Sequence, residues 1–298
     1  MKQKVALVLS GGGARGIAHI GAIEVLEEKG FEIASIAGTS MGALIGGIYV
    51  LGKLEVYKDW LFTLDKVKVF GMVDFTLSGQ GIIKGDRVIH KMRELVEDAN
   101  IEDLQIPYVA VAADIINKRE VVFRKGSVID AIRASIAIPT VFTPVRTEDG
   151  LLVDGGVINN LPIDHVKRNP DDILVVVDVN APIPCDRSHV SAHEVASRES
   201  KYQEKLKEFY SHLQSINPLA HEERFGYFDV INKTISMMTY HTTQLALQKH
   251  TPDILINVSH DSCGVYDFFK AHDMVEMGRH VAKKSIEVYQ NAMPQKSD

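Results

Sequence analysis

The chain has 298 residues, of which 45% are hydrophobic and 24% charged, so it can bury the core of one large α/β domain or two smaller ones. Its net charge is −6 and no block of Lys and Arg stands out, which argues against nucleic acid as a partner. The two cysteines, Cys185 and Cys263, lie far apart in the sequence and have no metal-ligand spacing. Without a disulfide framework, the chain is predicted to be intracellular.

The N-terminus resembles a secretory signal only superficially. Its apolar run at residues 5–9 is too short for the hydrophobic centre of a signal peptide, and glycines follow it at once. No segment of the sequence approaches the ~20 apolar residues that are needed to span a bilayer. We therefore expect a cytoplasmic protein that is either free or bound peripherally at a membrane surface.

Short β-branched runs alternate with helical patterns along the chain. In chain order, we predict a strand at 4–9, a helix at 16–29, a strand at 33–37, helices at 41–51 and 86–97, strands at 107–114 and 120–123, a helix at 127–137 and a strand at 172–177. A polar stretch at 186–224 is expected to form exposed helices or a mobile excursion. The sequence then predicts a helix at 228–248, a strand at 253–258 and a closing helix from 267 to about 290.

This alternation predicts an α/β fold with a mainly parallel central sheet flanked by helices. The run at 172–177 is almost entirely Ile, Leu and Val, which is typical of a parallel strand that is buried on both faces. Nothing in the composition marks a linker, so residues 1–298 are predicted to form a single domain.

A first glycine loop, LVLSGGGARG at residues 7–16, follows the first predicted strand. Its Gly11, Gly13 and Gly16 match the G-x-G-x-x-G fingerprint of dinucleotide-binding proteins. That interpretation needs an acidic residue at the end of the second strand to hold a ribose. The second strand ends in Ala-Gly, and Glu32 stands at its beginning instead. The sequence therefore disfavours a nucleotide site.

A second glycine loop contains the pattern Gly38-Thr39-Ser40-Met41-Gly42, which is G-x-S-x-G. It lies between a predicted strand and an apolar helix, and this is the context in which the pattern forms a nucleophile elbow. The small glycines at 38 and 42 would avoid a clash across such a sharp turn. The alternative is an ordinary turn in which Ser40 caps the helix.

A third loop, LLVDGGVINNLP at residues 151–162, places Asp154 after a strand-like triplet and before Gly155 and Gly156. Taken alone, Asp-Gly indicates a surface turn. A nucleophilic serine, however, needs a base that is held by rigid structure, and a carboxylate at a strand end can supply one. A carboxylate is a weak base at its usual pKa of ~3.9, so we expect burial to raise the pKa of Asp154.

The hydrolase interpretation gives the first loop a different task. The backbone N–H groups of Gly11, Gly12 and Gly13 would lie beside the Ser40 turn, because consecutive strands of such a sheet are usually neighbours. They would then form an oxyanion hole for a tetrahedral intermediate. Arg15 is expected to stabilise the loop as an ion-pair partner rather than to act directly in catalysis.

Together these motifs resemble the patatin-like phospholipases, and specifically their compact bacterial branch. GGGARG, GTSMG and DGG occur in the order of that family. The stretch AIRASIAIPTVFTPV at 131–145 is similar to the segment ahead of the family's catalytic aspartate, and DFFKAHDMVEMG at 267–278 to its closing helix. The match spans most of the chain and is weak only at 55–84 and 186–224.

The resemblance implies a patatin-like three-layer sandwich with a strand-to-helix nucleophile elbow. It also implies a serine lipid acyl hydrolase that acts on a lipid or acyl-ester substrate through a Ser–Asp dyad, without metal or other cofactor. By position, Ser40 would be the nucleophile and Asp154 the base. The oxyanion hole would come from Gly11–Gly13, chiefly Gly12 and Gly13. The supporting motif positions are Ala14, Arg15, Gly16, Gly38, Gly42, Gly155 and Gly156.

The sequence gives some independent support for a dyad instead of a triad. A single predicted strand precedes Ser40, whereas an ordinary α/β-hydrolase has several strands before its elbow. None of the 12 histidines stands in a pattern that marks a triad member. His19 is predicted to be a hydrogen-bonded helix residue. His165, which follows the Asp154 loop, is the one histidine that we single out for testing.

Residues 55–84 are unusually apolar. Tyr57, Trp60, Leu61 and Leu64 form one helical face, and a further group of apolar residues follows, namely Val67, Val69, Phe70, Met72, Val73 and Phe75. The segment is predicted to be a flap lining an acyl channel or a shallow membrane-contact patch. The alternative is a helix and loop that pack on the core.

Two other functions use the same sequence features. An acyltransferase would pass the acyl group from Ser40 to an alcohol or thiol instead of water. A non-catalytic regulator would bind a lipid or an acyl carrier. The oligomeric state stays open, and a homo-oligomer is one of the alternatives.

Overall fold

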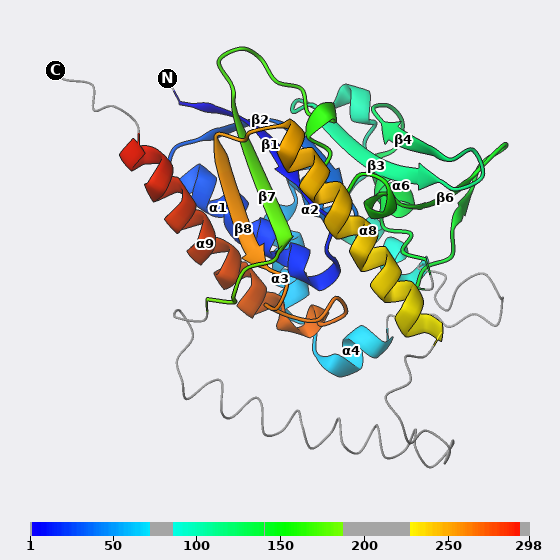
Figure 1. The fold of residues 1–298 in the computed structure, drawn as a ribbon. Helices are drawn as coiled ribbons and strands as arrows, with labels where there is room; N and C mark the ends of the chain where they lie inside the picture. The colour runs from blue at the N-terminus through cyan, green and yellow to red at the C-terminus, as the bar shows by residue number, and fades with distance from the viewer. Residues whose placement is uncertain (1, 72–85, 140, 187–226, 293–298) are drawn as a thin grey trace. The chain divides into compact units, whose positions relative to one another are not determined.

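The computed structural model describes residues 2–71, 86–139, 141–186 and 227–292. Within them, an eight-stranded sheet has the order β5-β6-β3-β2-β1-β7-β8, with β4 paired to β3 (Figure 1). The strands are β1 (Lys4–Leu9), β2 (Glu32–Thr39), β3 (Tyr108–Asp114), β4 (Arg119–Phe123), β5 (Val145–Arg146), β6 (Leu151–Asp154), β7 (Ile173–Ala181) and β8 (Ile254–Ser259). Strands β3, β2, β1, β7 and β8 pair in parallel, which confirms the predicted mainly parallel sheet.

Helices follow most of the parallel strands, as the alternation predicted. The described helices are α1 (Ala18–Glu28), α2 (Met41–Val50), α3 (Leu54–Phe62), α4 (Lys66–Gly71), α5 (Asp86–Leu95), α6 (Val128–Ser135), α8 (Tyr227–Lys249) and α9 (Ala271–Ala292). The helix predicted from residue 16 instead opens as a 3-10 turn, Gly13–Ile17. Strand β7 runs past its predicted end, because polar residues continue the strand beyond the apolar run.

The chain has two compact units, one of residues 1–185 and 235–298 and a second of residues 186–234. The layers described here belong to the first unit. The polar stretch predicted at 186–224 lies, from residue 187 onward, outside the described residues. The expectation of a single domain therefore stays a prediction.

The two faces of the sheet carry different cores. Alternate residues of β1 point to opposite faces, so that Leu7 and Leu9 join a large cluster with α1, α2 and α9, while Val8 joins a smaller one. The smaller cluster includes Leu161, and Ala246 of α8 packs against it. Figure 1 shows α8 crossing in front of the sheet and α1 behind it. The result is a helix–sheet–helix sandwich, the predicted three-layer architecture.

One detail of the sheet brings distant residues together. β2 and β6 share the same edge of β3, because β4 occupies the other edge. Thr39, the last residue of β2, is opposite Val111, and Asp154, the last residue of β6, is opposite Ala112. β6 is antiparallel to β3, so the ends of β2 and β6 meet. Because the two strand ends meet, Asp154 lies beside the turn that carries Ser40.

The predicted flap divides into different environments. Tyr57, Leu61 and Leu64 are buried, and Trp60 packs against the same core, so the core alternative is correct for this helical face. Val67 on α4, in contrast, is 79% exposed. Residues 72–85, with Met72, Val73 and Phe75, lie outside the described residues, as does the Phe70 side chain. The flap and membrane-contact hypotheses therefore stay predictions.

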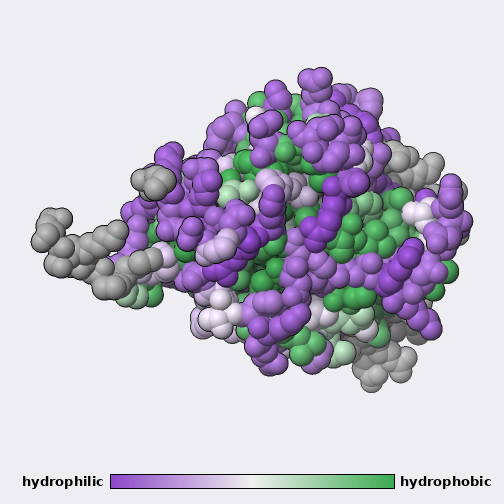
Figure 2. All heavy atoms as spheres, turned by 90° about the horizontal axis from the view of Figure 1, so that it is seen from above, coloured by the Kyte–Doolittle hydropathy of each residue, from purple (hydrophilic) through white to green (hydrophobic). Residues whose placement is uncertain are grey.

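No helix in the described part of the chain is both long enough and apolar enough to cross a bilayer. Figure 2 shows one face of the molecule, on which hydrophilic side chains predominate and apolar ones lie between them. Scattered surface apolar residues are ordinary in globular proteins.

Candidate active site

The turn between β2 and α2 holds Ser40 in an unusual backbone conformation. Its φ is 54° and its ψ is −121°, a positive φ that residues other than glycine rarely adopt. A Cβ at Gly42 would lie against the backbone carbonyl of Leu9, and a Cβ at Gly38 would meet the backbone of Gly42. Glycine is required at position 42 because the start of α2 packs directly on the end of β1, and at position 38 because the turn folds back onto β2. The strained serine between them has the features of a nucleophile elbow.

Ser40 and Asp154 are in direct contact. The Ser40 hydroxyl donates a hydrogen bond to Oδ2 of Asp154 at 2.5 Å, across 114 residues of sequence. The other carboxylate oxygen, Oδ1, accepts the backbone N–H of Gly156 at 2.8 Å. Both side chains are buried, with Ser40 5% and Asp154 6% exposed. The carboxylate is thus fixed in an orientation in which one oxygen can accept the hydroxyl proton.

Burial changes the acidity of this carboxyl group. Removal from water raises the pKa of Asp154 to about 6, although the hydrogen bonds from Ser40 and Gly156 act in the opposite direction. A carboxylate with a pKa near 6 is a stronger base than one at the ordinary value, and it is still ionised at neutral pH. This direction agrees with the expectation from the sequence.

The three loop glycines differ in what their backbone donors do. The N–H of Gly11 donates to the carbonyl oxygen of Asn160 at 3.3 Å. Among the residues that the structure describes, no acceptor receives the N–H of Gly12 or Gly13. Gly13 has a φ of +58°, and a Cβ there would meet the Val265 carbonyl. Two N–H groups that no described residue accepts therefore lie at positions where the structure has no room for a Cβ.

The loop is anchored to the end of β7. Arg15 donates from Nε to the carbonyl of Val179 at 3.1 Å and from Nη2 to the side-chain oxygen of Asn180 at 2.7 Å. Asn180 in turn donates to the Gly11 carbonyl at 2.6 Å. These acceptors are neutral oxygens, so the predicted ion pair of Arg15 is replaced by hydrogen bonds to the carbonyl and amide groups that the end of β7 places beside the loop.

The remaining motif positions shape the same region. Ala14 donates its N–H to the Val265 carbonyl at 2.8 Å. A Cβ at Gly16 would collide with the Met41 side chain, and one at Gly155 would collide with the Val111 carbonyl. All three positions are buried.

A cavity of about 440 Å³ opens over these groups. Gly12, Gly13, Ser40 and Asp154 line it together. Its walls combine apolar and polar side chains, mainly Ile138, Asn180, Ile235, Met237, Tyr240, His260 and Val265. A mostly apolar cavity with a few polar groups at one point is the usual form of a small-molecule site.

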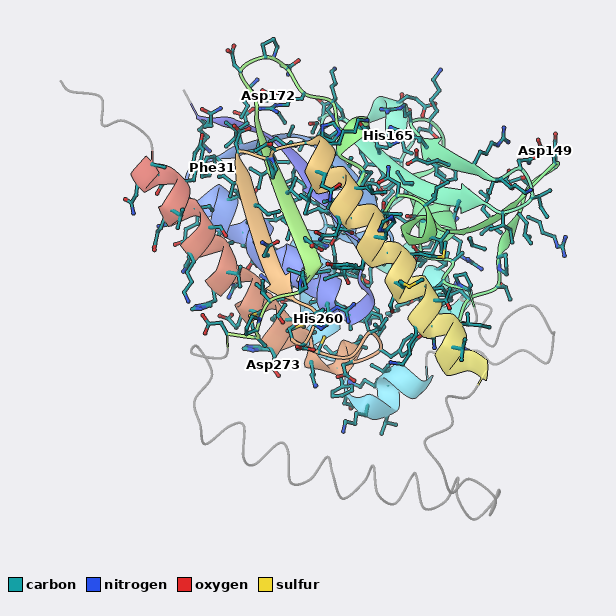
Figure 3. The ribbon with its side chains drawn as sticks, viewed as in Figure 1. Phe31, Asp149, His165, Asp172, His260 and Asp273 are labelled. Carbon is teal, nitrogen blue, oxygen red and sulfur yellow. The ribbon has the colours of Figure 1, made fainter. Side chains whose placement is uncertain are left out.

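The sequence predicted the environment of one histidine correctly but did not identify the histidine that lies at the cavity. His19 is fully buried and bonds through Nε2 to the Ser10 carbonyl at 2.8 Å, and burial lowers its pKa to about 4, which confirms the prediction of a hydrogen-bonded helix residue. His165 pairs with Glu120 at 2.9 Å and does not line the cavity, so singling it out was wrong. Figure 3 shows His165 beside the C-terminal end of α8, and His260 below the ends of β7 and β8. His260 is the histidine at the cavity.

Sequence reasoning also missed several polar residues around the site. Asn160 is buried, and its amide donates to Thr243 of α8 at 3.0 Å. Thr239 of α8 donates to the Gly156 carbonyl at 3.3 Å. A sequence signal was available for Asn180, which lies at the carboxyl end of the apolar strand β7, where such sites are formed. The residues of α8 carry no local signal of this kind.

A family model described as patatin-like phospholipase matches residues 7–167, which include all three glycine loops. The chain belongs to the patatin-like phospholipase family. An uncharacterized NTE family protein of Mycobacterium bovis is 31% identical, and the alignment covers 96% of this chain and 92% of that one. A lysophospholipase of Cryptococcus neoformans is 34% identical over 60% of this chain and 11% of its own length. VipD of Legionella pneumophila aligns with 97% of this chain and 67% of its own at a TM-score of 0.49 and 15% identity.

Membership of the patatin-like family supports a lipid hydrolase activity. Within the described residues, no group of three or more His, Cys, Asp or Glu side chains is arranged to hold a metal ion.

Proposed function

We propose that the protein is a serine acyl-ester hydrolase acting on lipids, in which Ser40 is the nucleophile and Asp154 the general base. The observation that supports this most strongly is the hydrogen bond from the Ser40 hydroxyl to a buried carboxylate with a raised pKa. The two groups also line a cavity, where an ester could reach them. Direct contact between nucleophile and base is what acyl transfer through a serine requires.

In the first step, Ser40 Oγ attacks the ester carbonyl carbon while its proton passes to Oδ2 of Asp154. The tetrahedral intermediate then collapses. The bond to the leaving alcohol breaks, the alcohol takes the proton from Asp154, and the acyl group stays on Ser40 as an ester. In the second step, water gives a proton to Asp154 and attacks the acyl-enzyme. Ser40 leaves with that proton, and the fatty acid is released.

Negative charge develops on the carbonyl oxygen in both steps. The N–H groups of Gly12 and Gly13, which have no acceptor in the part of the chain that the structure describes, are the donors that we assign to it, since the Gly11 donor is already bonded to Asn160. Loss of one such donor typically lowers the rate by about 10²–10³. The apolar walls formed by Ile138, Met237 and Val265 would hold the acyl chain.

A screen of ester substrates tests this proposal. Lysophospholipid, diacyl phospholipid and a short-chain nitrophenyl ester would be incubated with wild type, Ser40→Ala and Ser35→Ala, with and without a competing alcohol. Ser35 is a buried serine of β2 that lies outside the cavity, so its variant controls for loss of a buried hydroxyl. We expect fatty acid release by wild type and Ser35→Ala, and a loss of about 10³ or more in Ser40→Ala.

Other outcomes would redirect the assignment. Acyl transfer to the alcohol in excess of hydrolysis would make the protein an acyltransferase at the same serine. A folded wild type that cleaves none of the substrates would favour a binding protein for lipid or acyl carrier.

A further inference from the structure

At the elbow, the backbone N–H of Ser40 lies beyond the last pair of β2 with β3 and needs an acceptor from another element. Thr39 is the last residue of β2 that pairs with β3, opposite Val111. The next residue, Ser40, turns sharply away with its positive φ, and its N–H lies in the protein interior. An unpaired N–H in such a position is costly, and it would also leave the strained conformation without support.

A hydroxyl group from α6 fills this gap. The N–H of Ser40 donates to Oγ of Ser135 at 2.8 Å, and the Ser135 hydroxyl donates to the carbonyl of Val111 at 2.6 Å. Ser135 is fully buried at the end of α6. Its hydroxyl therefore bridges the elbow to β3 at the point where the ladder between β2 and β3 ends.

The same short segment also holds the other partner of the dyad. The N–H of Asp154 donates to the carbonyl of Ala137 at 2.9 Å. Residues 135–137 are thus bonded to the backbone of Ser40 on one side and to that of Asp154 on the other. Both bonds hold backbone that carries one of the two functional groups.

We propose that Ser135 is a positioning residue, whose hydroxyl holds the backbone of Ser40 so that the nucleophile stays within reach of Asp154. The inference rests on the proposed function of Ser40. Ser135 touches no part of the cavity, so it acts through Ser40 and not on the substrate. A second explanation is that Ser135 contributes only to stability, as any buried hydroxyl with two partners does.

Labelling kinetics with a fluorophosphonate separate the two explanations, because they report the reactivity of Ser40 apart from probe binding. The maximal labelling rate and the half-saturating probe concentration would be measured for wild type, Ser135→Ala, Ser135→Cys and Ser35→Ala, with Tm for each. Ser35 is the matched control, since its buried hydroxyl also donates to a backbone carbonyl, that of Lys167, but has no bond to the elbow.

We expect Ser135→Ala to lower the maximal rate by about 10- to 100-fold, because the Ser40 N–H loses its acceptor, with half-saturation changed by less than about twofold. Ser135→Cys adds little volume and keeps a weak donor and acceptor, so its rate should fall between those of wild type and Ser135→Ala. Ser35→Ala should lose a comparable amount of Tm and keep the wild-type rate.

Three results would contradict the inference. The first is a wild-type rate in a folded Ser135→Ala. The second is a wild-type rate in Ser135→Cys, which remains measurable if the alanine variant does not fold. The third is an equal rate loss in Ser35→Ala, which would indicate stability alone. A wild type that is not labelled on Ser40 would instead overturn the proposed function, and this inference with it.

Discussion

Asp154 is a residue at which stability and function make opposite demands. The proposed chemistry needs a carboxylate, whereas burial at 6% exposure disfavours the charge and raises the pKa to about 6. Hydrogen bonds from Ser40 and Gly156 stabilise the ionised form. A base of intermediate strength results, and this has consequences for both the pH dependence of activity and the stability of the fold.

The rate should follow the ionisation of Asp154. A protonated carboxyl group cannot accept the Ser40 proton, so we expect the maximal hydrolysis rate to rise with pH and level off above a midpoint near 6. A pH–rate profile of the wild type checks this. A profile that is flat from pH 5 to pH 8 would show that Asp154 is not the titrating base.

The stability of the fold, unlike the rate, should fall as the pH rises. The pKa of Asp154 is raised from 3.8 to about 6 on folding, so the protein loses stability as pH rises through this interval and the buried group ionises. We therefore expect Asp154→Asn to be more stable than wild type at pH 8 by about 1–3 kcal/mol, and the gain to disappear below about pH 4. Urea unfolding at both pH values measures it. A variant that is destabilised at pH 8 would contradict a desolvated carboxylate.

At the scale of elements, the site forms where the ends of β1, β2, β6 and β7 converge. The sequence could predict the loops after β1 and β2, because Gly-rich turns between a strand and a helix have a local pattern. It could also place Asp154 at a strand end. It could not predict that β6 meets β2 end to end on β3, because this arrangement depends on two separate long-range pairings, β2 with β3 and β6 with β3, and on which edge of β3 stays open.

The loop after β1 offers a test of the oxyanion assignment. Gly13→Ala places a methyl group against Val265 at a positive φ, so we expect a rate loss of about 10²–10³ through a displaced loop. Gly30→Ala is the matched control, because Gly30 also has a positive φ, +84°, but nothing lies near its Cβ position. It should cost about 1 kcal/mol of stability and leave the rate unchanged. Equal rate losses would indicate general destabilisation.

At the scale of the whole molecule, the cavity depends on contributions from far along the chain. Helix α8 supplies one wall with Met237 and Tyr240, and Thr243 bonds to Asn160 under the first loop. The helix itself was predictable from its sequence pattern. Its position was not, because a weakly amphipathic helix does not specify which face of a sheet it covers.

The apolar segment after α2 is a second case in which the sequence predicted a helix but not where the helix packs. The spacing of Tyr57, Trp60 and Leu61 predicted one helical face but could not decide between core, flap and membrane. In the structure the rings of Tyr57 and Trp60 pack 5.2 Å apart against the core. Burial is a property of the assembled layers, so no local pattern could supply the answer.

Stability measurements can check that assignment directly. Trp60→Ala removes a large, partly buried ring that packs against the core, and we expect it to cost ~2–3 kcal/mol and to lower Tm by ~4–10 °C. Val67→Ala, at a position that is 79% exposed, should leave Tm within about 1 °C of wild type. Thermal unfolding followed by circular dichroism measures both. The reverse order of effects would show that Trp60 does not pack against the core.

The central claim is that Ser40 is a nucleophile activated by Asp154, and covalent labelling tests it most directly. Wild type, Ser40→Ala and Asp154→Asn would be treated with a fluorophosphonate and the labelled peptide mapped by mass spectrometry. We predict a label on Ser40 in wild type, none in Ser40→Ala, and labelling slowed by at least about 10²-fold in folded Asp154→Asn. A folded wild type without label, or one whose labelling does not depend on Asp154, would contradict the account.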